Sequence, residues 1–209
     1  MISKFMLLDS EKRQQIVDAA MEEFAQKGYR NASTNAIVKK ANIAKGLLFH
    51  YFTNKQGLFE FLFDYAWQTF MDEFYSKVDL SETDLLRRLQ LIIALKIELT
   101  QRHPDLYDFI MAVAADDSAE AKAAMDKKYQ SAVVDGMAWV LRGIDTSHFR
   151  DGVDISRVMQ IIMWVVQGLT NREVEQLKTD HDYRAQYDIR ATMGEVSEYV
   201  ELLTTAFYD

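Results

Sequence analysis

A stripe of aromatic residues constrains the fold of this chain more than any other feature. The stripe recurs every three or four residues, the spacing that places side chains on one face of an α-helix. Its members are Phe59, Phe63, Trp67, Phe70 and Phe74. We therefore expect one long helix that begins at Lys55. Only one proline and eight glycines interrupt 209 residues, so the sequence predicts an all-α fold without a β-sheet.

Capping and breaking residues predict where the other helices begin and end. A first helical stripe covers residues 16–24, and two short helices follow before the long one. The predicted boundaries, in chain order, are a stop at Gly28, caps at Ser33 and Thr34, a capping box at residues 53–56, a cap at residues 81–84, a start at Pro104, a stop at Gly143 and a cap at Asp154.

Charge is unevenly distributed along the chain. From Phe24 to Phe59 there is no Asp or Glu, although a segment of that length with average composition would hold about 5.5. Residues 1–55 carry a net charge of +4, whereas the whole chain carries −8. A basic surface on an otherwise acidic protein is typical of polyanion binding.

Two short predicted helices, at residues 33–41 and 45–51, lie inside this acid-free segment. The turn between them needs a residue that tolerates a positive φ, and Asn42 meets that need. The pattern is that of a helix-turn-helix, whose second helix enters the major groove of DNA. We expect Leu48 and Phe52 of that helix to point into the core.

Further residues around the helix-turn-helix extend the pattern. They are Ile16 to Phe24, Gly28-Tyr29, Thr34, Ile37, Ile43, Lys45-Gly46, Phe49-His50-Tyr51-Phe52, Asn54-Lys55 and Leu58. Together they resemble the N-terminal domain of the TetR family of transcriptional regulators. Three positions depart from the usual pattern, with Val38, Asn42 and Phe49 where Ala, Gly and Tyr are common. Phe49 therefore lacks a phenol hydroxyl that could reach a phosphate.

The resemblance implies both an architecture and a function. It implies a homodimer with a helix-turn-helix DNA-binding domain at residues 1–54 and a helical ligand-binding and dimerisation domain at residues 55–209. The expected function is that of a repressor that binds a palindromic operator in double-stranded DNA and is released by a small-molecule inducer. Activation of transcription stays open as an alternative.

Side-chain chemistry assigns roles at the expected DNA surface. Lys45 can reach guanine O6 and N7 or a phosphate, Gly46 allows close approach of the backbone, and Leu47 can contact a thymine methyl. His50 follows Gly46 by about one turn on the same face and can donate to a base edge or a phosphate. The expected backbone contacts come from Thr34, Asn35, Tyr51 and Lys55. Core packing of Leu47 or His50 is the alternative.

Two further surfaces are predicted in the C-terminal part. The helices at about 155–178 and 191–208 are apolar on more than one side, which predicts a dimer seam, with a fully buried central helix as the alternative. A small, largely apolar ligand is expected to tilt the long helix and so change the spacing of the recognition helices. The expected ligand contacts, for which plain core packing is the alternative, are Trp67, Phe70, Tyr107, Met111, Tyr129 and Trp164.

Other functions have less support in the sequence. The chain has no cysteine, which fits a reducing cytoplasm. Its most apolar run, Ile161 to Val166, is far shorter than the roughly 20 residues that a membrane span needs. No catalytic, metal or phosphate-loop motif occurs, so we expect no enzyme, no cofactor and no metal. A helical enzyme or carrier that uses the basic segment for an anionic ligand, and a protein-interaction adaptor, are the alternatives.

Overall fold

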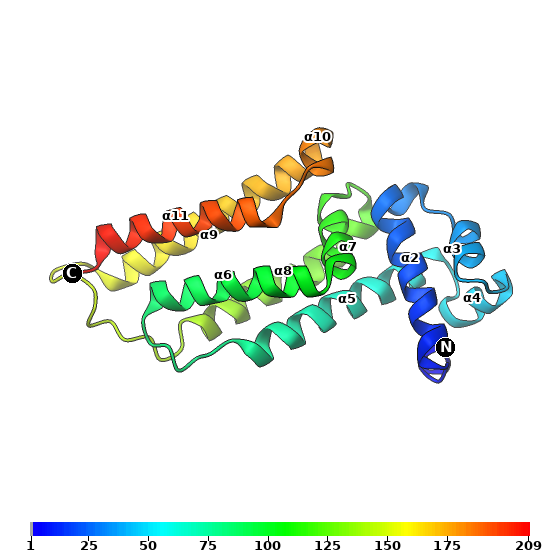
Figure 1. Ribbon diagram of the computed structural model, residues 1–209, viewed down its shortest axis with the longest axis horizontal. Helices are drawn as coiled ribbons and strands as arrows, with labels where there is room; N and C mark the ends of the chain where they lie inside the picture. The colour runs from blue at the N-terminus through cyan, green and yellow to red at the C-terminus, as the bar shows by residue number, and fades with distance from the viewer. Residues whose placement is uncertain (1) are drawn as a thin grey trace. The chain divides into compact units, whose positions relative to one another are not determined.

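The computed structural model is built from α-helices (Figure 1). It describes residues 2–209, without the side chains of residues 2, 3, 129–135, 137, 163, 166, 167, 170, 171, 173, 174, 177, 178, 181 and 184. The helices are α1 (Ile2–Met6), α2 (Ser10–Asn31), α3 (Thr34–Lys40), α4 (Lys45–Phe52), α5 (Lys55–Lys77), α6 (Leu85–Arg102), α7 (Pro104–Ala115), α8 (Ala119–Val140), α9 (Ile155–Thr179), α10 (His181–Ala185) and α11 (Ile189–Phe207). Among the described residues β-pairing is limited to an isolated bridge between Phe149 and Tyr208. The predicted all-α fold is confirmed.

The helices group into two compact units, each with its own apolar core. The first unit runs to Asp72 and includes His103–Lys128, so it holds α1 to α4, most of α5, α7 and the start of α8. The second unit holds Glu73–Arg102 and Tyr129–Asp209. These units are defined by packing, and the functional boundary expected between residues 54 and 55 stays a prediction.

Aromatic rings dominate the core of the first unit, where α2 packs against α7. Phe24 of α2, Phe59 of α5 and Phe109 of α7 are buried. The Phe59 ring lies edge-on to the other two, with centroid distances of 5.1 Å to Phe24 and 6.1 Å to Phe109. Such pairs add to the free energy gained by burying the rings. The aromatic stripe therefore begins as core, as its helical spacing predicts.

Most helix boundaries lie at the predicted capping residues. Ser33 accepts a hydrogen bond from the Ala36 amide at the start of α3, and Asp154 accepts one from the Arg157 amide at the start of α9. Pro104 occupies the first turn of α7, where its missing N–H costs nothing. Gly28, with a φ of +67°, interrupts the helical geometry near the end of α2.

The predicted capping box at residues 53–56 is wrong. Asn54 caps α5 instead, because its Oδ1 accepts a 2.8 Å hydrogen bond from the Gly57 amide. Thr53 closes α4 with a positive φ of 64°. The short helix α10 between α9 and α11 was not expected from the sequence, since five residues are too few for a periodic pattern.

In the second unit α11 packs against both α6 and α9. Leu86 of α6, Ile162 of α9 and Leu203 of α11 share its core. The predicted second apolar side of the tail helices remains uncovered within the protomer, since Trp164 of α9 is 69% exposed and Leu202 of α11 is 66% exposed. In the described part of the chain, every helix is too short or too polar to cross a lipid bilayer.

Candidate nucleic-acid interface

The turn of the helix-turn-helix is fixed by its own backbone and by α2. Asn42 has a positive φ of 49°, as predicted, and the Ile43 amide donates to the Val38 carbonyl at 3.0 Å. Lys12 of α2 reaches across, and its Nζ donates to the carbonyls of Ala41 and Asn42, both at 3.1 Å. An ammonium bound to two turn carbonyls ties the turn to the first long helix. The sequence pattern did not identify this role of Lys12, because its partners are 29 and 30 residues away.

Helix α4 separates a buried side from an exposed one. Leu48 and Phe52 are buried, which confirms their predicted place in the core. Lys45, Gly46 and His50 are exposed, and a Cβ added to Gly46 would meet no atom within 4 Å. The exposed side therefore carries two donors next to a position where a backbone can be approached closely.

The start of α4 suits an anionic partner. Its N-cap residue, Ala44, makes no side-chain hydrogen bond to the helix, so the first amides of α4 have no side-chain acceptor from the cap. Unsatisfied amides and the helix dipole together attract phosphate groups. Lys45 adds a positive charge at the same end, with its Nζ 5.9 Å from the Phe49 ring centroid.

The remaining expected contacts around α3 and α4 differ in exposure. Asn35 is exposed, whereas Thr34 and Leu47 are half-buried, and Leu47 packs partly against the core. Of the two lysines in α3, Lys40 forms an ion pair with Glu22 of α2. Lys40 is therefore partly neutralised by an acidic residue that precedes the acid-free segment.

Two residues expected to bind phosphate are engaged within the protein. Tyr51 is only 7% exposed, and its ring packs against Phe5 and Phe52. Its assignment to the DNA surface is corrected to the core, because a tyrosine on the inner side of an eight-residue helix gains more from burial than from solvent.

Lys55 also has a different role from the expected one. Its Nζ donates to three backbone carbonyls at the end of α2, those of Tyr29 at 2.8 Å, Arg30 at 3.1 Å and Ala32 at 3.2 Å. The ammonium also lies 4.8 Å from the Tyr29 ring centroid. The assignment of Lys55 as a phosphate anchor is corrected to that of a brace between α2 and α5, because all three donors of the ammonium have protein acceptors.

The six residues expected to contact a ligand divide between the two units. In the first unit Phe70 and Tyr107 have ring centroids 6.3 Å apart, and Trp67 lies 5.9 Å from Phe63; Met111 is half-buried. Trp164 belongs to the second unit and is largely exposed on α9. The side chain of Tyr129 lies outside the described residues.

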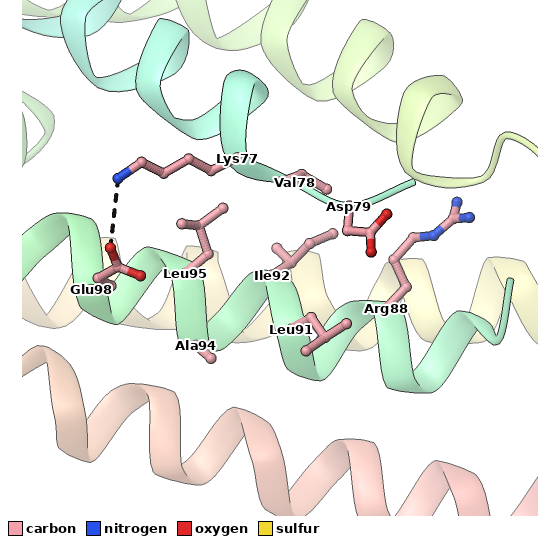
Figure 2. Close-up of a pocket in the computed structure, with 9 residues that line it drawn as sticks. All are labelled: Lys77, Val78, Asp79, Arg88, Leu91, Ile92, Ala94, Leu95 and Glu98. Carbon is pink, nitrogen blue, oxygen red and sulfur yellow. Dashed lines mark ion pairs between the residues drawn. The ribbon is translucent and has the colours of Figure 1, made fainter. Parts of the chain in front are cut away.

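A hollow of about 370 Å³ in the second unit offers a different candidate ligand site. Figure 2 shows that it lies between the end of α5, the segment that follows it and one side of α6. Its lining residues are Lys77, Val78, Asp79, Arg88, Leu91, Ile92, Ala94, Leu95 and Glu98. None of the six expected residues is among them, since the aromatic stripe ends at Phe74, before the part of α5 that lines the hollow. The volume is within the range of small-molecule sites.

Arg88 closes one end of this hollow and is fully buried. Its guanidinium donates to the carbonyls of Glu82 at 2.7 Å, Val140 at 2.6 Å, Arg142 at 2.9 Å and Leu80 at 3.0 Å. It therefore fastens the segment before α6 to the C-terminal end of α8, where carbonyls lack helix partners.

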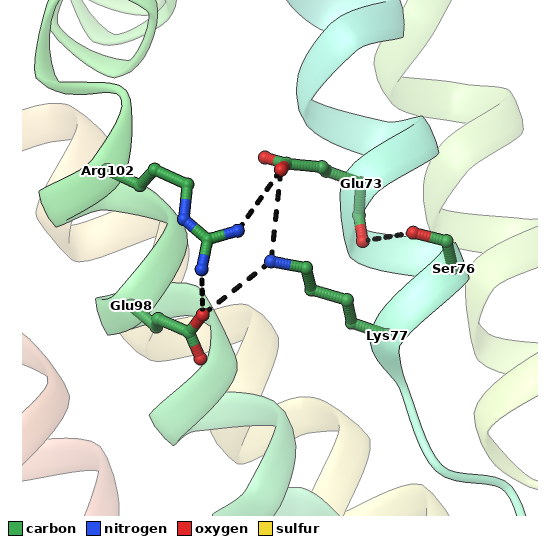
Figure 3. A network of polar contacts seen from close by, with 5 residues as sticks. All are labelled: Glu73, Ser76, Lys77, Glu98 and Arg102. Carbon is green, nitrogen blue, oxygen red and sulfur yellow. Dashed lines mark hydrogen bonds and ion pairs between the residues drawn. The ribbon is translucent and has the colours of Figure 1, made fainter.

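Two charged residues that line the hollow, Lys77 and Glu98, form ion pairs with each other and with neighbouring charges. Figure 3 shows a four-membered ion-pair network between α5 and α6. Glu73 pairs with Lys77 at 3.8 Å and with Arg102 at 3.2 Å, while Glu98 pairs with Lys77 at 3.6 Å and with Arg102 at 2.5 Å. At Asp79, hydrogen bonds from Ser81 outweigh a small opposing effect of desolvation and lower the pKa of the carboxyl group. The rim thus carries both signs of charge.

Comparisons with known proteins agree with the helix-turn-helix geometry. Residues 16–62 match the family model described as "Bacterial regulatory proteins, tetR family". The chain is 24% identical over 157 residues to the fatty acid metabolism regulator protein of Bacillus subtilis (strain 168). This match covers 74% of this chain and 79% of that protein. It is 49% identical over 47 residues to the uncharacterized HTH-type transcriptional regulator YvkB of the same organism, a match that covers 22% of this chain and 25% of that protein.

Solved structures share the fold over nearly the whole chain. The transcriptional regulator FadR from Bacillus subtilis, solved in complex with stearoyl-CoA, has a TM-score of 0.66 and 21% identity, and the match covers 90% of this chain and 96% of that chain. A TetR-like transcriptional regulator from Rhodococcus sp. RHA1 has a TM-score of 0.65 and 16% identity, with coverage of 93% and 96%. Residues 16–62 therefore match the tetR family of bacterial regulatory proteins, and nearly the whole chain shares the fold of TetR-like transcriptional regulators.

Proposed function

We propose that this protein is a ligand-responsive repressor that binds a palindromic operator as a homodimer, with α4 in the major groove. The observation that carries the proposal is the two-sided character of α4, which exposes Lys45, Gly46 and His50 while Leu48 and Phe52 hold the helix to its core. Lys45 and His50 would contact base edges or phosphates, and Asn35 with Thr34 would contact the backbone from α3. A regulator of this kind acts in the cytoplasm.

The proposed dimer seam is formed by α9 and α11. Ile161 and Trp164 of α9 are exposed, as are Tyr199 and Leu202 of α11. Large apolar side chains exposed on two adjacent helices are typical of surfaces that bind another protein. A second copy would cover these residues and present two α4 helices to successive major grooves about 34–36 Å apart.

The proposed inducer is a largely apolar small molecule, and a long-chain acyl-CoA is its first candidate. The support comes from the relationship to a fatty acid metabolism regulator and from the fold shared with a regulator solved with stearoyl-CoA. In this chain, Leu91, Ile92 and Leu95 give the hollow beside α6 an apolar wall, and Lys77 lies at its rim. Binding there would act on the last turn of α5, the helix that begins directly after the helix-turn-helix.

A gel shift on the DNA that flanks the coding region tests the DNA-binding proposal. We expect a specific complex with a palindromic site, and an affinity that falls steeply as the salt concentration rises, because binding to phosphates releases counterions. Lys45→Ala should weaken this complex while the protein stays folded. Binding that is weak, indifferent to sequence and unaffected by Lys45→Ala would overturn the proposal.

Release of the operator by acyl-CoA tests the proposed inducer. Stearoyl-CoA, the free fatty acid and coenzyme A alone should be added to the preformed complex. We expect the acyl-CoA to dissociate the complex and to raise the melting temperature of the free protein, because it binds the folded state. Release by coenzyme A alone would contradict an apolar inducer.

A further inference from the structure

We propose that the N-terminal helix α1 sets the orientation of the recognition helix α4 on DNA, with Phe5 as the positioning residue. This inference rests on the proposed DNA-binding function. Helix α1 precedes the part of the chain that matches the family model, which begins at residue 16. Helix α1 therefore lies outside the matched segment.

Phe5 lies at the centre of a cluster of aromatic rings. It is completely buried, and its ring lies edge-on to those of Tyr51 at 5.6 Å, Phe52 at 4.8 Å and Phe61 at 5.2 Å between centroids. Tyr51 and Phe52 belong to the last turn of α4, while Phe61 belongs to α5. One side chain from α1 thus packs between the recognition helix and the helix that follows it.

The cluster extends directly to the exposed side of α4. The ring of His50, which is proposed to face DNA, lies 5.6 Å from the ring of Tyr51. A change in the place of Tyr51 is therefore passed to its neighbour His50 and to the end of α4. Helix α4 has only eight residues and packs through Leu48, Tyr51 and Phe52. Phe5 contacts two of these three residues, so loss of its ring removes a large part of the packing that fixes the orientation of α4.

The N-terminal segment is itself held in place at Phe5 and directly after it. The Arg13 guanidinium of α2 donates a 3.0 Å hydrogen bond to the Met6 carbonyl. The Leu8 amide donates to the Phe5 carbonyl at 3.1 Å, and Asp9 caps α2 by accepting from the Glu11 amide at 2.9 Å. Phe5 is therefore presented by an ordered segment rather than by a free end.

The test compares Phe5→Ala with Leu7→Ala, a control whose side chain is 85% exposed in the same segment. Affinity is measured for a duplex selected by the wild-type protein from a randomised pool, and for a scrambled duplex, at a temperature where all variants are folded. We expect Phe5→Ala to weaken specific binding by about tenfold or more and to change binding to the scrambled duplex little, because nonspecific affinity depends mainly on charge. Leu7→Ala should behave like the wild type, and Phe5→Leu should recover most of the specific affinity.

A second buried substitution separates positioning from general stability. Phe109→Ala removes an equally buried ring from the same unit, and this ring packs against Phe59 of α5. It should lower the melting temperature but leave the ratio of specific to nonspecific binding unchanged. If Phe5→Ala only lowers the melting temperature in the same way and retains the wild-type ratio, the positioning role is overturned.

The NMR signal of the His50 imidazole, assigned by comparison with His50→Gln, tests the placement without DNA. Phe5→Ala should shift this signal through the displaced Tyr51 ring, whereas Leu7→Ala should not. An unchanged signal in Phe5→Ala contradicts the inference even if specific DNA binding is weakened. If the wild-type protein selects no duplex at all, the proposed function fails, and the NMR comparison still decides whether Phe5 positions α4.

Discussion

The backbone amide of Tyr29 donates a 2.6 Å hydrogen bond to the carboxylate of Asp116. Tyr29 follows the Gly28 break in α2, and Asp116 closes α7. The same carboxylate accepts a 2.8 Å hydrogen bond from the Ser118 amide. Packing is tight at this point, because a Cβ added to Gly28 would lie 3.0 Å from an Asp116 oxygen. The end of α2 is thus joined to the corner between α7 and α8 by one side chain.

Replacing Asp116 by alanine should destabilise the protein by about 1–3 kcal/mol, because two partly buried amides lose their acceptor. Urea denaturation followed by circular dichroism measures the change in the free energy of unfolding. Asp117→Ala is the matched control, since Asp117 forms an exposed ion pair with Arg30, worth less than about 1 kcal/mol. Equal losses of unfolding free energy in the two variants would show that the Tyr29 hydrogen bond adds no more stability than the exposed ion pair.

The same carboxylate should make stability depend on pH at the acid end. Burial alone would raise the pKa of Asp116, but hydrogen bonds from Tyr29 and Ser118, together with the charge of Arg30, lower it below its ordinary value. A group whose pKa is lower in the folded state stabilises the protein above its unfolded pKa of about 4 and loses this contribution as the pH falls through the folded value. Denaturation midpoints measured from pH 6 downward should fall below about pH 4 more steeply for the wild type than for Asp116→Asn. Parallel curves would contradict the lowered pKa.

Substitution of Lys55 should affect folding rather than only phosphate binding. Lys55→Met keeps the aliphatic stem but leaves the carbonyls of Tyr29, Arg30 and Ala32 without the ammonium, and we expect a loss of about 1–3 kcal/mol. Lys45→Met, at an exposed position, should leave stability within about 0.5 kcal/mol and weaken DNA binding. If both substitutions weaken DNA binding and neither lowers the melting temperature, Lys55 is a phosphate contact after all.

Arg88 should be among the most sensitive residues of the second unit. Arg88→Met removes the donors of four backbone carbonyls in a buried site, and the expected cost is about 3 kcal/mol or more. Arg87, its exposed neighbour, pairs with Glu82 through its side chain, so Arg87→Met should cost less than about 1 kcal/mol. Thermal melts of the two variants measure the difference, and similar melting temperatures would refute the bracing role of Arg88.

The titration of Tyr208 at alkaline pH should reflect its partly buried position in the second unit. Burial is the main cause that raises the pKa of Tyr208 to about 12, and the nearby Asp84 adds to the increase. Hydrogen bonds from the backbone amides of Leu86 and Leu85 oppose it. A tyrosine whose pKa is raised on folding stabilises the protein below its unfolded pKa of about 10 and loses that contribution as the pH rises through the folded value. Absorbance at alkaline pH should show a late tyrosine titration that is reduced in Tyr208→Phe. A normal titration of all tyrosines would contradict this.

Local sequence signals predicted the helices and the inner side of α4 well. The aromatic spacing located α5, Asn42 located the turn, and the apolar character of Leu48 and Phe52 placed them in the core. Each of these signals depends on neighbours within a few residues, so one sequence contains the needed information.

The roles that were missed or misassigned depend on partners far along the chain. Lys12 binds carbonyls in the turn, Lys55 binds carbonyls of α2, and Arg88 binds carbonyls beyond α8. A lysine or arginine in a sequence gives no sign of whether its side chain will bind a phosphate or a carbonyl oxygen, so its partner could not be predicted. Tyr51 was misassigned for a related reason, because the ring that covers it comes from Phe5.

Chemical protection of guanine N7 and adenine N3 in the bound operator tests most directly whether α4 lies in the major groove. Dimethyl sulfate methylates guanine N7 in the major groove and adenine N3 in the minor groove. We expect protection of guanine N7 in two symmetric half-sites about one helical turn apart, with loss of that protection in Lys45→Ala at protein concentrations that still saturate the DNA. Protection confined to adenine N3, or a pattern that Lys45→Ala and His50→Ala leave unchanged, would show that α4 is not the reading helix.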